Sequence, residues 1–290
     1  MAFQVMILGS SGMAGHILTH YLTEKTEFEV VDVGPRRKVE PKTLLYDLED
    51  TNLLKNLISE VKPNVIVNCT GVLVQASELR KREAVWFNSY LPHFLSEYCM
   101  LSGIRLIHLS TDCVFSGQAG PYDENDHRDG EAFYDRSKAL GEIVDNANLT
   151  IRTSIIGPEL RRDGTGLFNW VMMQRNTIRG YQKALWSGVT TLELAKAICF
   201  FIETHTTLSG LVHYSVPGGI SKYELISQIN EVFERNLKIV AVDDPVLDKR
   251  LVSSRTDLKM SPSDYSTQLI ELKEWIYSHP DVYPHYLEKA

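Results

Sequence analysis

The chain has 290 residues, of which 43% are hydrophobic and 23% charged, as expected of a globular protein with one large core or one core plus a smaller lobe. Its net charge of −7 argues against nucleic acid as a partner, because no surplus of Lys and Arg is available to neutralise phosphates. No apolar run approaches the roughly 20 residues of a membrane-spanning helix, so no membrane partner is expected.

The first residues, MAFQVMILG, carry no charged segment and lead directly into an apolar run, so we expect no signal peptide. The four cysteines lie far apart and form no CxxC pair; they are Cys69, Cys99, Cys113 and Cys199. We therefore expect no disulfide framework, no metal site and a location in the reducing cytoplasm.

The first half of the chain alternates short apolar runs with amphipathic stretches. The patterns predict strands at Phe3–Leu8, Glu29–Val33, Asn64–Cys69, Ile104–Leu109 and Leu149–Ile156. They predict helices at Gly12–Glu24, Thr51–Glu60, Glu78–Met100 (with Pro92 at a break or a helix start) and Phe133–Asn146. This alternation is typical of βαβ units and predicts an α/β fold, a Rossmann-like doubly wound parallel sheet, over residues 1–157.

Beyond Pro158 the alternation weakens. Amphipathic helices are predicted at Thr191–Glu203 and Ser221–Glu234, and we expect residues 187–204 to pack back on the main sheet. The rest of 158–290 is predicted to form mostly a smaller C-terminal substrate-binding lobe.

A glycine-rich loop, Gly9-Ser10-Ser11-Gly12-Met13-Ala-Gly15, joins the first predicted strand to the first predicted helix. Glycine removes the Cβ that would block a pyrophosphate, and the following helix start offers free N–H groups and the positive end of the helix dipole. The loop therefore predicts binding of a dinucleotide cofactor through Gly9, Ser10, Ser11, Gly12 and Met13.

The adenosine end of the cofactor is predicted to lie near the second strand. Asp32 is placed to bind the ribose and favours NADH, whereas Arg36 and Arg37 are placed to pair with a 2′-phosphate and favour NADPH. The balance slightly favours NADPH. Asp47 and Leu48, which follow a third apolar run, are predicted from their position to contact the adenine.

Tyr134 and Lys138 are spaced by four residues, which places the phenol and the ammonium group on one face of a predicted helix. A free tyrosine has a pKa of about 10, and a nearby cation lowers it toward the working range of a proton donor. The Ser110-Thr111 pair ends a central strand, where a polar group can orient a substrate carbonyl. A tyrosine and a lysine four residues apart are common by chance. Their occurrence with the glycine loop and the Ser110-Thr111 pair in one chain favours a nicotinamide-dependent active site.

Three stretches resemble the dTDP-4-dehydrorhamnose reductase family: Ser110-Thr-Asp-Cys-Val-Phe-Ser-Gly117, Gly120-Pro-Tyr-Asp-Glu-Asn-Asp126 and Tyr134-Asp-Arg-Ser-Lys-Ala-Leu-Gly-Glu142. The resemblance covers nearly the whole chain and implies reduction of the 4-keto group of a nucleotide-activated 6-deoxyhexose. It assigns the proton to Tyr134, the hydrogen bond to the carbonyl to Thr111, and the cofactor ribose to Lys138.

The resemblance also implies further site residues. The cofactor would be lined by Cys69, Thr70, Gly71, Val72, Asn88 and Ser110, and the sugar nucleotide by Val74, Cys113, Val114, Phe115, Arg161 and Trp186. Arg162 and Lys183 join Arg161 as candidates for the substrate pyrophosphate. Cys113 stands where many relatives carry tyrosine, which leaves the sugar open.

Two other interpretations remain open at this stage. One is a non-catalytic NADP-binding protein resembling the regulatory subunit of methionine adenosyltransferase, and the other is a nucleotide-sugar epimerase, which uses the same Tyr and Lys. The resemblance likewise leaves open whether the chain forms a homodimer.

Overall fold

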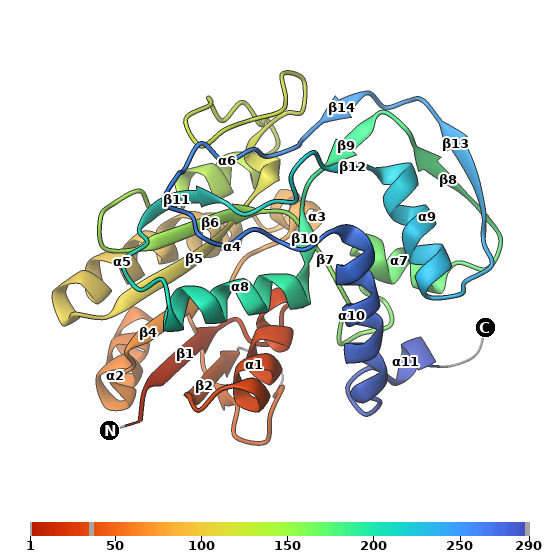
Figure 1. Ribbon diagram of the computed structural model, residues 1–290. Helices are drawn as coiled ribbons and strands as arrows, with labels where there is room; N and C mark the ends of the chain where they lie inside the picture. Colours follow the sequence, from red (N-terminus) through yellow and green to blue (C-terminus); the bar gives the residue numbers. More distant parts are fainter. Residues whose placement is uncertain (1, 35–37, 288–290) are drawn as a thin grey trace.

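The computed structural model describes residues 2–34 and 38–287, and its centre is a seven-stranded parallel sheet (Figure 1). In sheet order the strands are β11 (Gly210–His213), β6 (Leu149–Thr153), β5 (Arg105–Thr111), β4 (Val65–Asn68), β1 (Gln4–Leu8), β2 (Glu29–Gly34) and β3 (Leu44–Leu45). The chain reverses its direction of winding between β1 and β4, the place where such sheets bind ligands at their carboxyl edge. The predicted Rossmann-like α/β fold is confirmed.

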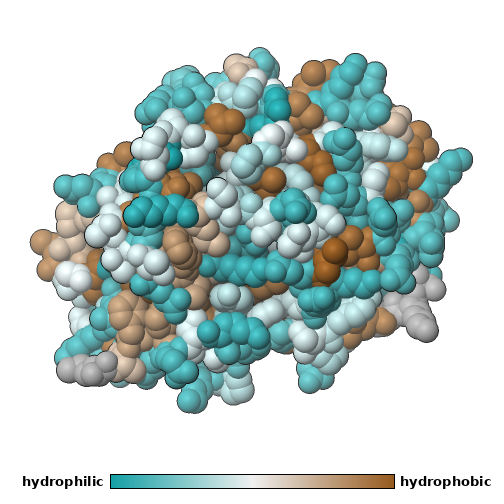
Figure 2. Space-filling model, viewed as in Figure 1, coloured by the Kyte–Doolittle hydropathy of each residue, from teal (hydrophilic) through white to brown (hydrophobic). Residues whose placement is uncertain are grey.

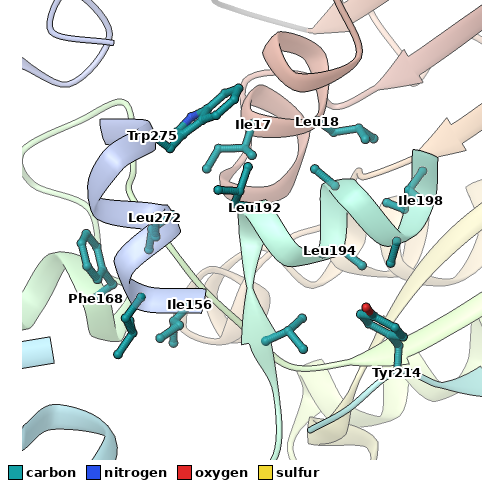
Figure 3. Close-up of a cluster of buried hydrophobic side chains, with 14 of the residues drawn as sticks. Ile17, Leu18, Ile156, Phe168, Leu192, Leu194, Ile198, Tyr214, Leu272 and Trp275 are labelled. Atoms are coloured by element: carbon teal, nitrogen blue, oxygen red, sulfur yellow. The ribbon is translucent and has the colours of Figure 1, made fainter. Parts of the chain in front are cut away.

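Helices cover both faces of this sheet because the strand side chains alternate between two apolar clusters. In β1, Val5 and Ile7 face the cluster that contains α1 (Met13–Lys25) and α8 (Thr191–Glu203). Met6 and Leu8 face the cluster of α2 (Thr51–Val61) and α5 (Leu91–Ser102). Figure 3 shows α1 and α8 meeting through side chains such as Ile17 and Leu192.

Three predicted elements differ from the structure by more than two residues at an end or by an interruption. The predicted helix 78–100 is divided into α3 (Val74–Leu79), α4 (Lys81–Ala84), the π-helix η1 (Val85–Tyr90) and α5, in which Pro92 lies in the first turn. α6 (Phe133–Leu140) ends six residues before the predicted Asn146, where Gly141 packs against the backbone of Asn88. The predicted strand 149–156 is interrupted at Ser154, because β7 (Ile155–Ile156) leaves the sheet to pair with β10 (Val189–Thr190).

The C-terminal part carries two small sheets and several helices, visible on the right of Figure 1. One sheet places β9 (Ala184–Trp186) between β12 (Ile220–Ser221) and β14 (Leu247–Asp248), and the other pairs β8 (Thr177–Tyr181) with β13 (Lys238–Val242). The helices are α7 (Leu167–Met173), α9 (Lys222–Val232), α10 (Tyr265–Ser278) and α11 (Pro284–Leu287). Phe168, Leu272 and Trp275 belong to the same apolar cluster as α1 and α8, so this part shares its core with the sheet.

Hydrophilic side chains cover most of the face seen in Figure 2, and apolar ones form scattered groups between them. Within residues 2–34 and 38–287, none of the helices combines the length and apolar character needed to cross a bilayer. All four cysteines are free thiols.

Candidate active site

The glycine loop closes tightly between β1 and α1. Gly9 has a φ of +83°, and the amide groups of Gly9 and Ser10 donate to the carbonyl of Val33 at 2.8 and 3.1 Å. A Cβ at Gly9 would lie 2.9 Å from the backbone nitrogen of Thr70, and one at Gly15 would overlap the carbonyl oxygen of Gly9. Glycine is therefore required at both positions, and the loops that follow β1 and β4 lie in contact.

α1 begins at Met13 with Gly12 as its N-cap, and no side chain of the described residues caps it. The first amide groups of a helix lack intrahelical partners, so this end offers N–H donors and the positive end of the helix dipole. Ser10 is fully buried, Ser11 is half-buried, and the side chain of Met13 lies against Gly166 in the loop before α7. The loop fits an anionic diphosphate, because the helix start offers free N–H groups and the exposed Gly12 places no side chain over them.

The residues predicted for the adenosine end have mixed surroundings. Asp32 is buried at the end of β2 and accepts a hydrogen bond from the Thr43 hydroxyl at 2.7 Å. Asp47 is exposed, whereas the Leu48 side chain is buried in the cluster of α2 and α5. The Leu48 carbonyl accepts a hydrogen bond from the indole N–H of Trp86 at 3.2 Å. Arg36 and Arg37 lie outside the described residues.

The loop after β4 is held from both ends. Oδ1 of Asn68 accepts hydrogen bonds from the backbone N–H and the hydroxyl of Thr70, at 3.1 and 2.6 Å. Oδ1 of Asn88 accepts from the backbone N–H of Val72 at 2.8 Å, and its Nδ2 donates to the Val72 carbonyl at 3.0 Å. Cys69, Thr70 and Gly71, which lie between these anchors, are at least partly accessible.

Asn88 also connects this loop to the helix of Tyr134. Its Nδ2 lies 3.0 Å from the Ser137 hydroxyl, and the neighbouring Ser89 hydroxyl donates to the Ser137 carbonyl at 2.7 Å. Both residues belong to the π-helix η1, a local widening of the helix that often occurs at functional sites. Asn88 therefore positions two parts of the site relative to each other.

Tyr134, Lys138 and Thr111 meet at the carboxyl edge of β5. The Thr111 hydroxyl lies beside the phenol of Tyr134 and influences its pKa, and Nζ of Lys138, one helical turn further, donates to the Leu109 carbonyl at 2.7 Å. Thr111 and Tyr134 are half-buried and Lys138 is buried. The structure thus brings the three predicted catalytic residues together.

Burial raises the pKa of the Tyr134 phenol, and the neighbouring Cys113 raises it further, while the interaction with Thr111 lowers it less strongly. This corrects the expectation that a neighbouring cation lowers this pKa. The phenol keeps its proton at neutral pH, as a proton donor must. Burial lowers the pKa of Lys138 to about 8, against the opposing effect of the Glu142 carboxylate.

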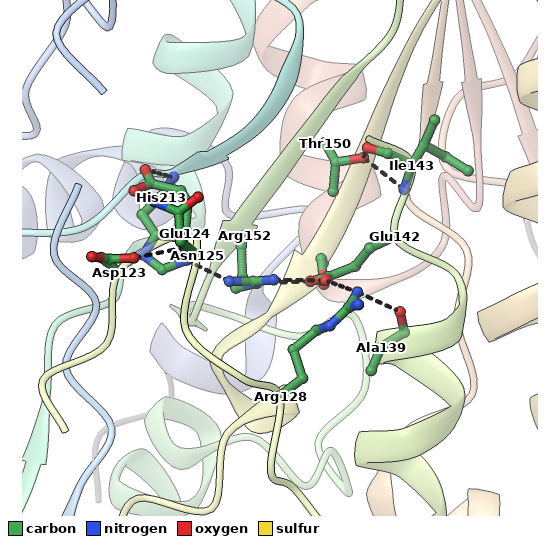
Figure 4. A network of polar contacts seen from close by, with 11 residues as sticks. Asp123, Glu124, Asn125, Arg128, Ala139, Glu142, Ile143, Thr150, Arg152 and His213 are labelled. Carbon is green, nitrogen blue, oxygen red and sulfur yellow. Dashed lines mark hydrogen bonds and ion pairs between the residues drawn. The ribbon is translucent and has the colours of Figure 1, made fainter. Parts of the chain in front are cut away.

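Ser110, in β5, contacts a buried network of charged side chains. Its hydroxyl donates to Oε1 of Glu142 at 2.6 Å. Glu142 also accepts two hydrogen bonds from Arg152, at 2.7 and 2.6 Å, and one from Arg128 at 3.0 Å (Figure 4). Burial raises the pKa of Glu142, but the hydrogen bonds and charge of Arg152 outweigh it, so the net pKa is lowered. Ser110 therefore supports the strand end, in contrast to the predicted role beside the cofactor.

Two residues predicted to contact the substrate lie inside the protein. Val114 and Phe115 are 1% and 0% exposed and form a small apolar cluster with Tyr122. The Phe115 ring stacks on that of Tyr122 with 4.1 Å between centroids, and the guanidinium of Arg152 lies 4.9 Å from its centre. Their side chains fix the conformation of the loop after β5 and are not presented to a ligand.

The remaining predicted substrate residues lie at different depths. Val74 is exposed at the start of α3, and Cys113 is half-buried next to Tyr134, where burial raises the pKa of its thiol to about 12. Trp186 is buried in β9, beneath the ammonium group of Lys222 at 4.4 Å from the ring centroid. Two predicted phosphate partners are exposed and already paired with carboxylates, Arg161 with Asp163 at 2.5 Å and Lys183 with Asp243 at 3.1 Å.

Several site residues were not predicted from the sequence. His108 lies buried in β5 with its Nδ1 at 3.2 Å from Nδ2 of Asn68, and burial lowers its pKa well below the usual value. Ser137, Lys222 and Lys249 also reach the site, from α6 and from the two ends of the small β12–β9–β14 sheet.

Comparison with known proteins agrees with this geometry. The curated dTDP-4-dehydrorhamnose reductase of Aggregatibacter actinomycetemcomitans is 23% identical over 298 residues, which cover 94% of this chain and 99% of that protein. A hypothetical dTDP-4-dehydrorhamnose reductase from Sulfolobus tokodaii has a similar structure, with a TM-score of 0.77, 27% identity and coverage of 91% of this chain and 98% of that one.

The dTDP-4-dehydrorhamnose reductase of Bacillus anthracis, whose structure was solved in complex with NADP, superposes with a TM-score of 0.78 at 20% identity and covers 94% of this chain and 99% of that chain. At this identity the likeness shows the fold. The model of the RmlD substrate binding domain family matches residues 3–281, almost the whole chain. Taken with the resemblance of the Ser110–Glu142 stretch, this match means that the chain belongs to the RmlD substrate binding domain family.

Proposed function

We propose that this protein reduces the 4-keto group of a nucleotide-activated 6-deoxyhexose with NADPH, in the manner of a dTDP-4-dehydrorhamnose reductase. The observation that carries the proposal is the meeting of the Thr111 hydroxyl and the protonated phenol of Tyr134 at the carboxyl edge of β5, one helical turn from Lys138. A proton donor and a second hydroxyl that meet at one point are what reduction of a ketone requires. The family membership and the named relatives support the same reaction.

A nicotinamide cofactor fits the residues at the carboxyl edge of the sheet. The uncapped start of α1 and the loop of three glycines suit its diphosphate, and the loop Cys69–Val72 would line the nicotinamide side. NADPH is proposed ahead of NADH, in line with the NADP complex of the Bacillus anthracis relative. The bound cofactor supplies the hydride.

The chain's own residues would handle the carbonyl oxygen. Thr111 orients it by a hydrogen bond, and Tyr134 gives up the proton that neutralises the developing alkoxide. Lys138, whose Nζ is fixed on the Leu109 carbonyl one helical turn from Tyr134, would hold the cofactor ribose. Asn88 keeps the loop of Val72 and the helix of Tyr134 in register during this step.

Other parts of the proposal concern organisation and location. Residues 1–157, with 187–204, would bind the cofactor, and most of 158–290 would bind the substrate. The protein would act in the cytoplasm, consistent with its four free thiols. A homodimer is proposed as well, supported by the exposed apolar side chains Leu79 and Leu140 on the neighbouring helices α3 and α6; light scattering of the purified protein tests it.

Loss of NADPH absorbance on addition of dTDP-4-dehydrorhamnose tests the activity, with UDP-, GDP- and CDP-linked 4-keto sugars as parallel substrates. We expect turnover of at least one of them and a reduced sugar as product. Cofactor binding without turnover of any would favour a non-catalytic regulatory role. A change in sugar stereochemistry without net consumption of NADPH would favour an epimerase.

A further inference from the structure

Two lysines, Lys222 and Lys249, emerge on the same face of the small sheet β12–β9–β14. Ser221 and Asp248 both pair with Leu185, on opposite edges of β9. Because β12 is antiparallel to β9, the next residue, Lys222, aligns with Ala184. Because β14 is parallel to β9, Lys249 aligns with Trp186. The amide of Lys249 donates to the Leu185 carbonyl at 3.1 Å, which continues the pairing by one residue. Ala184 and Trp186 lie on one face of β9 because side chains alternate along a strand. Both lysines therefore lie on the Trp186 face.

This face is turned toward the loop that follows Thr111. A Cβ at Gly117 would lie 2.9 Å from Cγ of Lys249, so the lysine stem packs directly on that loop. Lys249 also lies near Asp135, where its charge lowers the carboxyl pKa against the dominant, raising effect of burial. Asp135 is the immediate neighbour of Tyr134 on α6, so Lys249 reaches the surroundings of the phenol.

The ammonium of Lys222 rests on an aromatic ring instead of a carboxylate. It lies 4.4 Å from the centroid of Trp186, and burial lowers its pKa to about 8, while Asp112 and Cys113 oppose that effect. Asp112 and Cys113 directly follow Thr111 and influence the phenol of Tyr134 as well. Lys222, Lys249 and Tyr134 thus surround the same short stretch of chain.

Neither ammonium group has an ion pair or a hydrogen bond to a side chain within the described part of the chain. The two cations repel each other, since Lys249 lowers the pKa of Lys222. Burying a cation without a partner is costly, and a divalent anion between two such groups would relieve both costs. By contrast, Arg161 and Lys183 already hold carboxylates at the exposed surface.

We propose that Lys222 and Lys249 bind the diphosphate of the nucleotide-sugar substrate. The inference rests on the proposed function, because it supplies the anion that a nucleotide-activated sugar carries and places it beside Tyr134. The diphosphate is attached to C1 of the sugar and the keto group is at C4, at the opposite end of the ring. With the C4 keto group at Tyr134, the diphosphate on C1 would lie one sugar ring away. The two lysines, beside the stretch of chain that contacts the phenol, are placed to bind it.

Isothermal titration of the purified full-length protein, loaded with NADP, tests the site directly. The probes are dTDP, UDP, GDP, CDP and ADP, together with inorganic pyrophosphate. The variants are Lys222→Met, Lys249→Met and their combination, with Lys238→Met, an exposed lysine of β13, as the matched control. Each single variant should weaken binding of the preferred nucleoside diphosphate by roughly tenfold to a hundredfold, the usual value of a hydrogen bond to a charged group.

NADP affinity should stay unchanged in the variants, and the thermal unfolding midpoint should not fall, because each variant removes a cation that has no described anionic partner. Lys222→Arg, which keeps the charge, should retain most of the affinity. If Lys222→Met fails to fold, Lys249→Met decides the question, because the Lys249 side chain is half-buried and its ammonium has no described partner. Unchanged binding in both single variants overturns the site, and so does a wild-type protein that binds none of the nucleoside diphosphates. Lost binding in a protein that reduces no keto sugar would support the site and refute the proposed reaction.

Discussion

Nη1 of Arg152 donates a hydrogen bond to Nε2 of His213 at 2.7 Å, deep inside the protein (Figure 4). Arginine can only donate, so Nε2 of His213 must accept and carries no proton. The other ring nitrogen, Nδ1, lies 2.8 Å from the Val252 carbonyl and donates to it. The pair therefore fixes His213 as a neutral imidazole and connects β6 and β11 to the segment that follows β14.

This arrangement predicts a loss of stability in mild acid. Burial, with the charge of Arg152 next, lowers the pKa of His213 from 6.5 to about 4. In the unfolded chain this imidazole binds a proton below about pH 6.5, whereas in the folded chain it does so only below about pH 4. The free energy of unfolding therefore falls as the pH is lowered through that window. The contribution of His213 is up to about 3 kcal/mol.

Urea denaturation at a series of pH values between 7 and 4 measures this effect. His213→Gln, which removes the titrating ring, should flatten the pH dependence in that window, and His127→Gln at an exposed position should not. An equal slope in wild type and His213→Gln would contradict the assignment of a neutral histidine.

Removing the phenolic hydroxyl tests the proton donor. Tyr134→Phe keeps the ring in its half-buried position but removes the hydroxyl that lies beside Thr111. We expect kcat to fall by about 10²–10⁴-fold, the usual contribution of a proton transfer, with little change in NADPH affinity. Steady-state kinetics and a fluorescence titration of NADPH provide both numbers. Tyr277→Phe on the exposed face of α10 is the control, and near-normal turnover by Tyr134→Phe would disprove the mechanism.

Asn88 should matter for both stability and cofactor binding. Asn88→Ala removes the partners of the Val72 N–H and carbonyl and the contact with Ser137. A buried polar group left without a partner costs about 1–3 kcal/mol, so the free energy of unfolding should fall by at least this amount. NADPH affinity should also weaken, because the loop Cys69–Val72 loses its anchor. Asn52→Ala, at an exposed position of α2, controls for the loss of an amide side chain, and an unaltered NADPH affinity would refute the positioning role.

Two glycines of the phosphate loop should respond differently to alanine. A Cβ at Gly15 would overlap the carbonyl of Gly9, which is fixed backbone, whereas one at the exposed Gly12 would come no closer than 3.3 Å to the same oxygen. Gly15→Ala should therefore lower the thermal unfolding midpoint strongly. Gly12→Ala should fold, and lose affinity for NADPH because its methyl group stands at the helix start where we propose that the diphosphate binds. Thermal unfolding with and without NADPH separates the two effects, and equal midpoints for both variants would contradict it.

The sequence by itself determined the features that local patterns encode. Alternating apolar runs predicted the parallel sheet, and helix periodicity gave Thr191–Glu203 with the bounds that the structure has. The glycine spacing predicted the loop at Gly9, and the four-residue spacing placed Tyr134 and Lys138 on one side of a helix. Each of these depends on residues within one element or one turn, so the information is contained in a short stretch of chain.

Only the tertiary structure decided the rest, because packing brings together residues whose separation along the chain carries no periodic signal. Asn88 and Ser137 meet only when η1 packs on α6, and that same close contact at Gly141 ends α6 before the predicted Asn146. Burial, which no local pattern measures, raised the pKa of Tyr134 and moved Phe115 from the predicted substrate site into a core cluster. Strand register on β9 then placed Lys222 and Lys249, which are separated by the whole of α9 and β13, on one face beside the active-site loop.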